Sequence, residues 1–369
     1  METAHDAADP ATFMRGLVAE LAAEGVAVWR ARYALMTKHP EVLWRSVRWR
    51  AGEVDIEDQP HERLDEPFYM DSPVHAVREG ATSIRVPLGS GIMPYPVCED
   101  LRAQGGTDYF IQRLAFTTGQ VSYVSWAASE PGGFTDAAIA TLERIRLFLA
   151  RRLELESAYY ATRALLGVYL GHNAARRVLA GEFQRGKGEL IDAAIWFSDM
   201  RDFTALSDRA TPAVVIAKLD RYFDAVASAI SAGGGEVLKF IGDAVLAIFP
   251  VGGDARSACR RALDAAEAAL AAIDRLGDDI SIGVALHRGQ VMYGNIGAKD
   301  RLDFTVISSA VNEASRLEGL CKRLATPLAL SEAFVGAAGL ENVLDLGSHE
   351  LKGVSAPLHV FTPGHLARS

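Results

Sequence analysis

The sequence predicts an α+β protein with two domains, and three observations carry this prediction. The chain has 369 residues, which is more than one typical domain and suits two. Short apolar runs that end in glycine or aspartate turns indicate strands, and longer segments with apolar residues at helical spacing separate them. A helical stretch followed by a polar, glycine-containing segment at residues 181–188 divides the two halves.

The N-terminal half is expected to open with a helix and continue as an antiparallel sheet. Residues 55–67 are acidic and contain prolines, which predicts a loop. Residues 118–119 form a Thr-Gly turn between two strands, which predicts a hairpin. The other expected elements are a helix at 13–24, a turn at 38–40, and strands at 26–33, 41–50, 83–88, 109–117 and 120–127.

Some side chains of this half permit two interpretations. Arg45, Arg48 and Arg50 could form a basic patch that faces a ligand, or they could lie on the solvated face of the sheet, which we favour. Cys98 or His75 could carry a chromophore or haem, but buried or solvated bystanders are the simpler expectation.

The end of the N-terminal half resembles a GAF-type sensor domain. A terminal hairpin, a loop ending in Phe134-Thr135-Asp136 and a long helix from residue 137 carry this resemblance. The resemblance implies that residues 1–150 bind an unknown small ligand over the sheet and regulate the second half.

The connecting helix has an apolar seam with arginines between its members. The spacing is typical of a short parallel coiled coil, and it fits equally well a helix that packs back on its own domain. Residues 161–179 are expected to continue the helix, and residues 151–189 to act as a helical linker. The seam consists of Leu142, Ile145, Leu149 and Leu153.

Two aspartates of the C-terminal half are expected at one sheet edge. Residues 193–197 form a short apolar run, which predicts a buried strand that leads to Asp199. Residues 236–240 and 244–249 predict a hairpin whose turn contains Asp243. Each aspartate alone could simply stabilise a turn. Together, two carboxylates beside flexible turns suit hard divalent cations.

Three ordered motifs resemble the catalytic domain of class III nucleotide cyclases. They are FSDMRDFT at 197–204, EVLKFIGDAVLAIF at 236–249 and VISSAVNEASRLEG at 306–319, and the resemblance covers about residues 190–361. It implies a ferredoxin-like βαββαβ core and a homodimer with active sites shared between chains. It also implies conversion of a nucleoside triphosphate to a 3′,5′-cyclic monophosphate.

The resemblance assigns roles residue by residue. Asp199 and Asp243 are expected to hold two Mg²⁺ or Mn²⁺ ions. Asn312 would orient the ribose and Arg316 would stabilise the α-phosphoryl transition state. The two residues are four positions apart, which places them on one helical face. Lys239 and Thr305 match the pair that selects adenine, which implies ATP. Contacts to the rest of the substrate are expected from Phe203, Thr204 and Lys352.

The sequence departs from the family pattern at several positions. Asp202 replaces a glycine, Ser308-Ser309 replace Gly-Asp, and Gln290 stands where some relatives have an arginine. A second hairpin is expected from residues 280–286 and 290–296 around His287-Arg288-Gly289. His287 and Arg288 could approach the phosphates, or the turn alone could explain them.

Composition narrows the function further. A net charge of −9 without a strongly basic stretch argues against nucleic-acid binding. The acidic, polar first residues and the lack of an apolar run near ~20 residues argue against a secretory signal or a membrane span, so we expect a cytoplasmic protein. Three widely separated cysteines fit a reducing compartment. A catalytically silent dimer is one alternative, but the retained motif aspartates disfavour it. A diguanylate cyclase is another, and the lack of a GG[DE]EF motif disfavours it.

Overall fold

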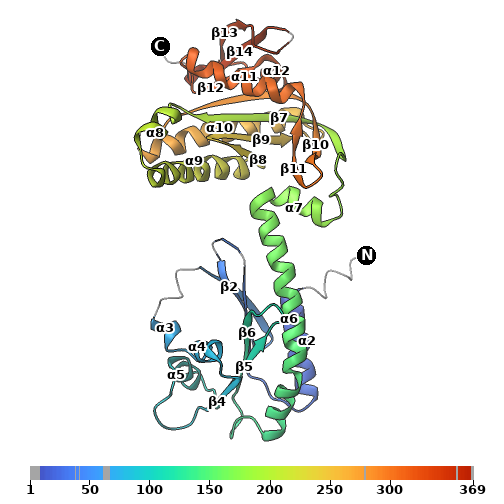
Figure 1. The fold of residues 1–369 in the computed structure, drawn as a ribbon, viewed down its shortest axis with the longest axis vertical. Helices are drawn as coiled ribbons and strands as arrows, with labels where there is room; N and C mark the ends of the chain where they lie inside the picture. The colour runs from blue at the N-terminus through green and yellow to red at the C-terminus, as the bar shows by residue number, and fades with distance from the viewer. Residues whose placement is uncertain are drawn as a thin grey trace. The chain divides into compact units, whose positions relative to one another are not determined.

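The computed structural model describes residues 9–37, 39–40, 42–60, 67–277, 280–354 and 356–366 (Figure 1). The chain divides into two compact units, Met1–Val168 and Tyr169–Ser369. Each unit is built around its own sheet. The N-terminal turn that we expected at residues 38–40 includes Lys38, which lies outside the described residues.

The N-terminal unit contains a six-stranded antiparallel sheet in the order β3-β2-β1-β6-β5-β4. Its strands are β1 (Arg30–Met36), β2 (Val42–Arg50), β3 (Glu53–Pro60), β4 (Ser83–Pro87), β5 (Asp108–Ala115) and β6 (Val121–Ala128). Its helices are α2 (Pro10–Ala23), α3 (Pro67–Met70), α4 (Pro73–Glu79), α5 (Pro96–Ala103) and α6 (Asp136–Leu170). Apolar residues of α2 and α6 pack on one face of the sheet, and those of α4 and α5 pack on the other.

Two expectations for this unit need correction. The first strand begins at Arg30 and not at residue 26. Residues 53–60 form strand β3, where a loop was expected from residue 55 onward. Asp55 and Asp58 pair with Arg48 and Arg45 across the β2–β3 ladder, at 2.8 and 2.7 Å. Acidic residues are therefore tolerated in this edge strand because each meets an arginine of the neighbouring strand.

The apolar seam of α6 packs on its own unit. Leu142, Leu149 and Leu153 are fully buried with Met14 and Trp126 in one cluster, and Ile145 is partly buried beside them. The alternative of a helix that packs back on its own domain is therefore correct, and these residues do not form a coiled-coil seam. Helix α6 ends before Gly171, which has a φ of +83°.

The C-terminal unit contains an eight-stranded sheet in the order β13-β14-β12-β10-β7-β9-β8, with β11 paired to β10. Its strands are β7 (Gly188–Met200), β8 (Glu236–Ile241), β9 (Ala244–Pro250), β10 (Ile282–Ala298), β11 (Arg301–Ile307), β12 (Leu328–Ser331), β13 (Val343–His349) and β14 (Leu358–Pro363). Its helices are α7 (His172–Leu179), α8 (Phe203–Arg209), α9 (Pro212–Ala232), α10 (Ala255–Leu276), α11 (Ser309–Arg323), α12 (Glu332–Ala338) and the short η2 (Gly364–Leu366).

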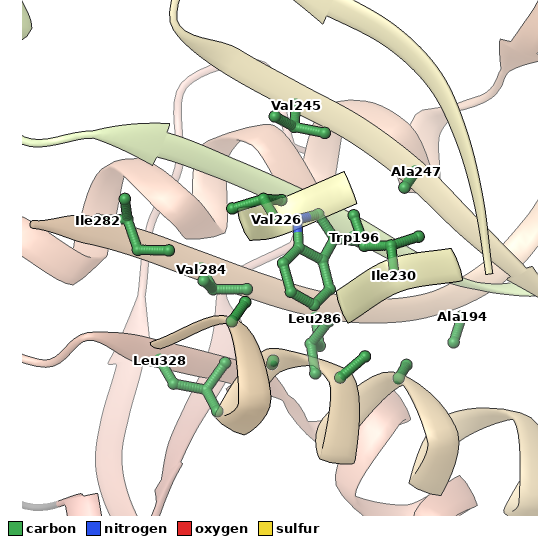
Figure 2. Packing of buried hydrophobic residues seen from close by; sticks show 14 of the residues in the cluster. Ala194, Trp196, Val226, Ile230, Val245, Ala247, Ile282, Val284, Leu286 and Leu328 are labelled. Atoms are coloured by element: carbon green, nitrogen blue, oxygen red, sulfur yellow. The ribbon is translucent and has the colours of Figure 1, made fainter. Parts of the chain in front are cut away.

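The main core of this unit lies between the sheet and helices α9 and α10. Figure 2 shows Trp196 of β7 with Val226 and Ile230 of α9. Helix α10 contributes mostly alanines to this core, so its backbone can approach the sheet closely. Buried residues of α11 pack with the opposite face of the sheet. Residues of β7 and β9 are therefore buried on both faces of the sheet.

The second hairpin that we expected is wrong, because β10 is one continuous strand of 17 residues. His287 pairs with Ile195 and Gly289 with Ala193 in the ladder to β7. Gly289 has no left-handed φ, and a Cβ atom there would clash with Ala310 of α11. This glycine therefore permits the close approach of a helix and does not mark a turn.

Candidate active site

Asp199 and Asp243 lie side by side at one edge of the C-terminal sheet. Asp199 is near the end of β7, and Asp243 is in the tight β8–β9 turn. The ladder pairs Ser198 with Val245, so Asp199 lies opposite the residues that follow Asp243. Ser198 is fixed by buried hydrogen bonds with Trp196 and Tyr222, at 3.0 and 3.2 Å. The structure thus confirms that the two motif aspartates share one edge.

The two carboxyl groups are close enough to share a proton. Burial, a hydrogen bond with Asp243 and the negative charge of Asp243 raise the pKa of Asp199 to about 7. The backbone N–H of Met200 donates to Asp199 Oδ1 at 3.1 Å, and this hydrogen bond lowers the pKa of Asp199. Two carboxylates in this position repel each other unless a proton or a cation lies between them.

The carboxylate pair fits divalent cations in its chemistry. Within the described ranges, no group of three or more His, Cys, Asp or Glu side chains forms a cation site. Mg²⁺ commonly uses only one or two carboxylates and takes its other ligands from water and substrate phosphates. Asp199 and Asp243 are therefore sufficient for a site that is completed by a phosphorylated substrate.

Glu318 of helix α11 is a third carboxylate near this edge. It is only 7% exposed, and its Oε1 lies 3.6 Å from Arg201 Nη1. Burial raises the pKa of Glu318, while Arg201 lowers it and Asp243 raises it further. Gly283 provides the space, because a Cβ atom there would clash with Arg201 and Glu318. A glycine within an otherwise apolar strand was the signal that could have indicated this pair.

Lys239 and Thr305 lie on neighbouring segments of the unit. Lys239 of β8 forms an ion pair with Asp303 of β11, and both side chains are about 40% exposed. Thr305 is two residues beyond Asp303 in the same strand, so the two share a face. Asp303 was not predicted from the sequence as the partner of this lysine, because it belongs to a strand far away in the chain. In this arrangement the lysine ammonium already has an anionic acceptor.

Asn312 and Arg316 project from the exposed face of α11. The opposite face buries Ala310, Ala314 and Leu317, which fixes the orientation of the helix. Ser308 caps the helix by accepting a hydrogen bond from Val311 N at 3.3 Å, so the Ser-Ser departure retains a capping function. In the part of the chain that the structure describes, neither Asn312 nor Arg316 has a hydrogen bond or ion pair. Both side chains are therefore available to a ligand.

The remaining expected substrate contacts are more scattered. Asp202 precedes α8 with a φ of +54°, which explains why a glycine suits this position and why an aspartate is tolerated. Phe203 packs on the core and Thr204 is exposed at the start of α8. Lys352 lies in an exposed turn. Across the described ranges, no hydrogen bond or ion pair links Lys352 to the carboxylate pair.

His287 and Arg288 do not lie in a turn, and His287 is enclosed by protein. Its Nδ1 lies 2.8 Å from Ser331 Oγ, and its Nε2 lies 3.4 Å from Glu313 Oε2. Burial lowers the pKa of His287 to about 4, so its ring is neutral at pH 7 and its contact with Glu313 is not an ion pair. Arg288 pairs with Asp192 of β7. Gln290 is exposed in β10. His287 is therefore a structural residue that joins β10, α11 and β12.

Two cavities of the C-terminal unit lie elsewhere. One, of about 280 Å³, is lined by residues that include Arg201, Asp202 and Lys322, and the other, of about 240 Å³, by residues that include Arg177 and Asn295. Neither is lined by Asp199 or Asp243. Among the described residues, no helix is long and apolar enough to cross a membrane.

Comparisons with known proteins agree with this geometry. Residues 188–341 match the family model of the adenylate and guanylate cyclase catalytic domain. An adenylate cyclase of Anabaena cylindrica is 36% identical over 153 residues, which are 38% of this chain and 30% of that protein. Adenylate cyclase 1 of Rhizobium meliloti is 34% identical over 175 residues, which are 45% of this chain and 26% of that protein. The chain thus spans less than a third of the length of these two relatives.

Among solved structures, a bacterial light-regulated adenylyl cyclase is similar with a TM-score of 0.52 and 21% identity. The match covers 70% of this chain and 87% of that chain, and it supports the fold. Together, the family match and the curated relatives support a catalytic domain of the class III nucleotide cyclase type in the C-terminal unit.

Proposed function

We propose that the cyclase-type catalytic domain of the C-terminal unit converts ATP to 3′,5′-cyclic AMP and pyrophosphate. The observation that carries this proposal is the contact between Asp199 and Asp243 at the end of β7 and the β8–β9 turn. In the reaction, the ribose 3′-oxygen forms a bond to the α-phosphorus and loses its proton to water. The bond from the α-phosphorus to the bridging oxygen breaks, and pyrophosphate leaves.

The residues of the chain contribute positioning and electrostatics. Asp199 and Asp243 would hold two Mg²⁺ or Mn²⁺ ions, which when bound neutralise the phosphates and polarise the α-phosphate. Arg316 would donate to the α-phosphoryl oxygens as charge develops on them, and Asn312 would orient the ribose. Phe203 and Thr204, which follow the left-handed Asp202, would contact the phosphates through their backbone amides, and Lys352 would contact the terminal phosphate.

The base would be selected by Lys239 and Thr305. A lysine ammonium can donate to N1 of adenine, which is an acceptor, whereas N1 of guanine carries a hydrogen. The threonine hydroxyl can accept from the 6-amino group. In this structure Lys239 donates to Asp303, which orients its ammonium group. N1 of adenine would replace Asp303 as the acceptor.

The active site would be shared between two copies of the chain. Asn312 and Arg316 are exposed, and among the described residues neither has a partner or a contact with the carboxylate pair. Phe240 and Ile241, beside the β8–β9 turn, and Ile307, before α11, are 49%, 47% and 58% exposed. A second copy would cover these apolar side chains and bring its own Arg316 to the carboxylates.

We further propose a division of labour along the chain. Residues 1–150 would be a GAF-like sensor for a small ligand, residues 151–189 a helical linker, and residues 190–369 the catalytic domain. The antiparallel sheet of the N-terminal unit, with helices on both faces, supports a ligand-binding role for the first part. A cytoplasmic location, where ATP is available, follows from this function.

The experiment uses the purified full chain with ATP or GTP and with Mg²⁺ or Mn²⁺, and identifies the products by mass. We expect cyclic AMP from ATP and a loss of at least about 10²-fold in Asp199→Ala and Asp243→Ala, since both cation positions depend on them. Asp264→Ala, an exposed residue of α10, is the matched control and should retain activity. Full turnover in either motif variant would remove the basis of the proposal.

A further inference from the structure

Four arginines gather on one face of the N-terminal sheet. Strands β1 and β2 are antiparallel, and their register places Arg30 opposite Arg50 and Arg32 opposite Arg48. Side chains of directly opposed residues, and of residues two apart in one strand, point to the same face. The four guanidinium groups therefore occupy adjacent positions on the face that also carries Ala34, Tyr109 and Tyr123, which pack against α4 and α5.

Among the described residues, carboxylates of β3 balance the two arginines of β2 and do not reach those of β1. The register places Glu53 opposite Arg50 and Asp55 opposite Arg48 on this same face. Arg48 pairs with Asp55 at 2.8 Å, and Arg50 donates to Gln104 Oε1 at 2.6 Å and stacks over Trp29 at 4.4 Å. Arg32 donates only to Ser46 Oγ at 3.2 Å. No hydrogen bond or ion pair reaches Arg30 from any residue in the described ranges. Like charges directly opposite each other destabilise a sheet, and within the described ranges Arg30 and Arg32 have no carboxylate partner that would offset this cost.

Arg30 is the most informative of the four. It is half-buried, and burial lowers its pKa, with further lowering by the charges of Arg32 and Arg48. Its register partner on the other side is Ala127, and Arg32 faces Ser125, so small side chains adjoin both arginines. A partly desolvated guanidinium without an acceptor is costly, which indicates that an acceptor is supplied from outside the chain.

Arg45, on the opposite face of β2, provides a comparison. Arg45 donates from Nε and Nη2 to both carboxylate oxygens of Asp58, at 2.7 Å each, and stacks over Tyr160 at 3.9 Å. On that face the chain therefore supplies a bidentate carboxylate to the arginine. Arg30, by contrast, is half-buried and has no such carboxylate within the described ranges.

We propose that this face binds a phosphate group, with Arg30 and Arg32 as the principal donors and Arg48 and Arg50 at the rim. Two adjacent guanidinium groups offer several parallel N–H donors, which suit a dianion with acceptor oxygens on one centre. A monocarboxylate supplies one charge and two oxygens and would satisfy only one arginine. The phosphate can be free or part of a phosphorylated small molecule. The proposal specifies a phosphate group as the ligand of the proposed sensor. It uses only observations from the N-terminal unit.

Hydrogen–deuterium exchange of the full chain tests the proposal. The probes are inorganic phosphate and glycerol 3-phosphate, with acetate and chloride at matched ionic strength. We expect both phosphates to slow exchange in β1 and β2, and acetate and chloride to have no such effect. A stronger effect of glycerol 3-phosphate would indicate a phosphorylated molecule, and an equal or stronger effect of inorganic phosphate would indicate the free ion.

The variants make the test specific. Arg30→Gln with Arg32→Gln should weaken phosphate protection by at least about tenfold, because charge-assisted hydrogen bonds are lost. Arg45→Gln, on the opposite face, should keep it. Exchange in β5 and β6 shows whether the double variant folds. If it does not fold, Arg30→Lys is used to test the site, because this change keeps the charge and removes the planar guanidinium group.

Phosphate protection no greater than that of acetate, or full protection in the folded double variant or in Arg30→Lys, would overturn the site. Cyclase activity is not the readout, so the outcome is independent of whether the C-terminal unit cyclises ATP.

Discussion

Glu318 and Arg201 form a buried pair that joins helix α11 to the strand end that carries Asp199. Their charged atoms are 3.6 Å apart, and the carboxylate of Glu318 also acts electrostatically on Asp199 and Asp243. Arg201 follows Asp199 by two residues, so whatever holds Arg201 also limits where Asp199 can move. The pair therefore links the helix of Arg316 to the position of the carboxylates.

Replacing Glu318 by Gln should lower both stability and activity. The change leaves the mostly buried Arg201 without its counter-charge, which should cost about 1–3 kcal/mol of unfolding free energy. Because Glu318 does not touch the expected reacting atoms, activity should fall about tenfold rather than vanish. Urea unfolding and initial rates measure the two effects. Glu341→Gln, an exposed residue, is the control. Unchanged unfolding in Glu318→Gln would show that the pair does not stabilise the unit.

Stability should fall below pH 6.5 because of His287. Its pKa is about 4 in the folded chain and near 6.5 when unfolded, so between these values the unfolded state binds more protons. This loss begins as the pH falls below about 6.5 and is complete near pH 4, and it should reach about 2 kcal/mol at pH 5.

His287→Gln should remove this part of the pH dependence, although it also disturbs the contacts with Ser331 and Glu313. The informative quantity is therefore the difference between the urea midpoints at pH 7.5 and pH 5, compared with wild type and with the exposed His172→Gln. An identical difference in His287→Gln and wild type would contradict the assignment.

Base selection should follow Lys239. In Lys239→Glu, a carboxylate would face N1 of adenine and would lie near Asp303, the present partner of the lysine. We expect the ratio of kcat/KM for ATP to that for GTP to fall by at least about 10²-fold, since an unpaired acceptor costs a few kcal/mol. Lys218→Glu on α9 is the comparison. If the ratio is unchanged, this position does not contact the base.

Two inactive variants should complement each other if the site is shared. In a mixed dimer of Asp199→Ala and Arg316→Ala, one site receives both changes and the other receives neither. With random pairing, half of the dimers are mixed, so activity should return to about a quarter of wild type. Size-exclusion chromatography and a tag exchange assay confirm mixing. No recovery after confirmed exchange would show that each chain carries a complete site.

The sequence predicted the parts of the site that depend on local patterns. The β8–β9 hairpin and the juxtaposition of Asp199 with Asp243 follow from short apolar runs and turn residues. The errors arose where a distant partner decides the outcome. Asp55 and Asp58 indicate a loop until Arg48 and Arg45 are known to lie opposite them.

Gly289 and Glu318 illustrate the same limit. Gly289 indicates a turn unless the approach of Ala310 is known, and Glu318 indicates a solvated charge unless Arg201 is known to be its neighbour. In both cases the chemical type of the residue is visible in the sequence, but its contact is made by an element far away in the chain. Such contacts are set by tertiary packing, which local propensity does not encode.

Strand β7 has a mechanical consequence. It runs without interruption for 13 residues from Gly188, the last residue of the glycine-containing segment, to Met200, directly after Asp199. Hydrogen bonds to β10 along almost this whole length, and to β9 along its second half, make it stiff against extension. Tension applied at Gly188 therefore loads the ladders to β10 and β9, so Asp199 can move along the strand axis only together with the neighbouring strands. The carboxylate edge thus lies at the far end of a rod whose near end is the point where the chain enters the sheet.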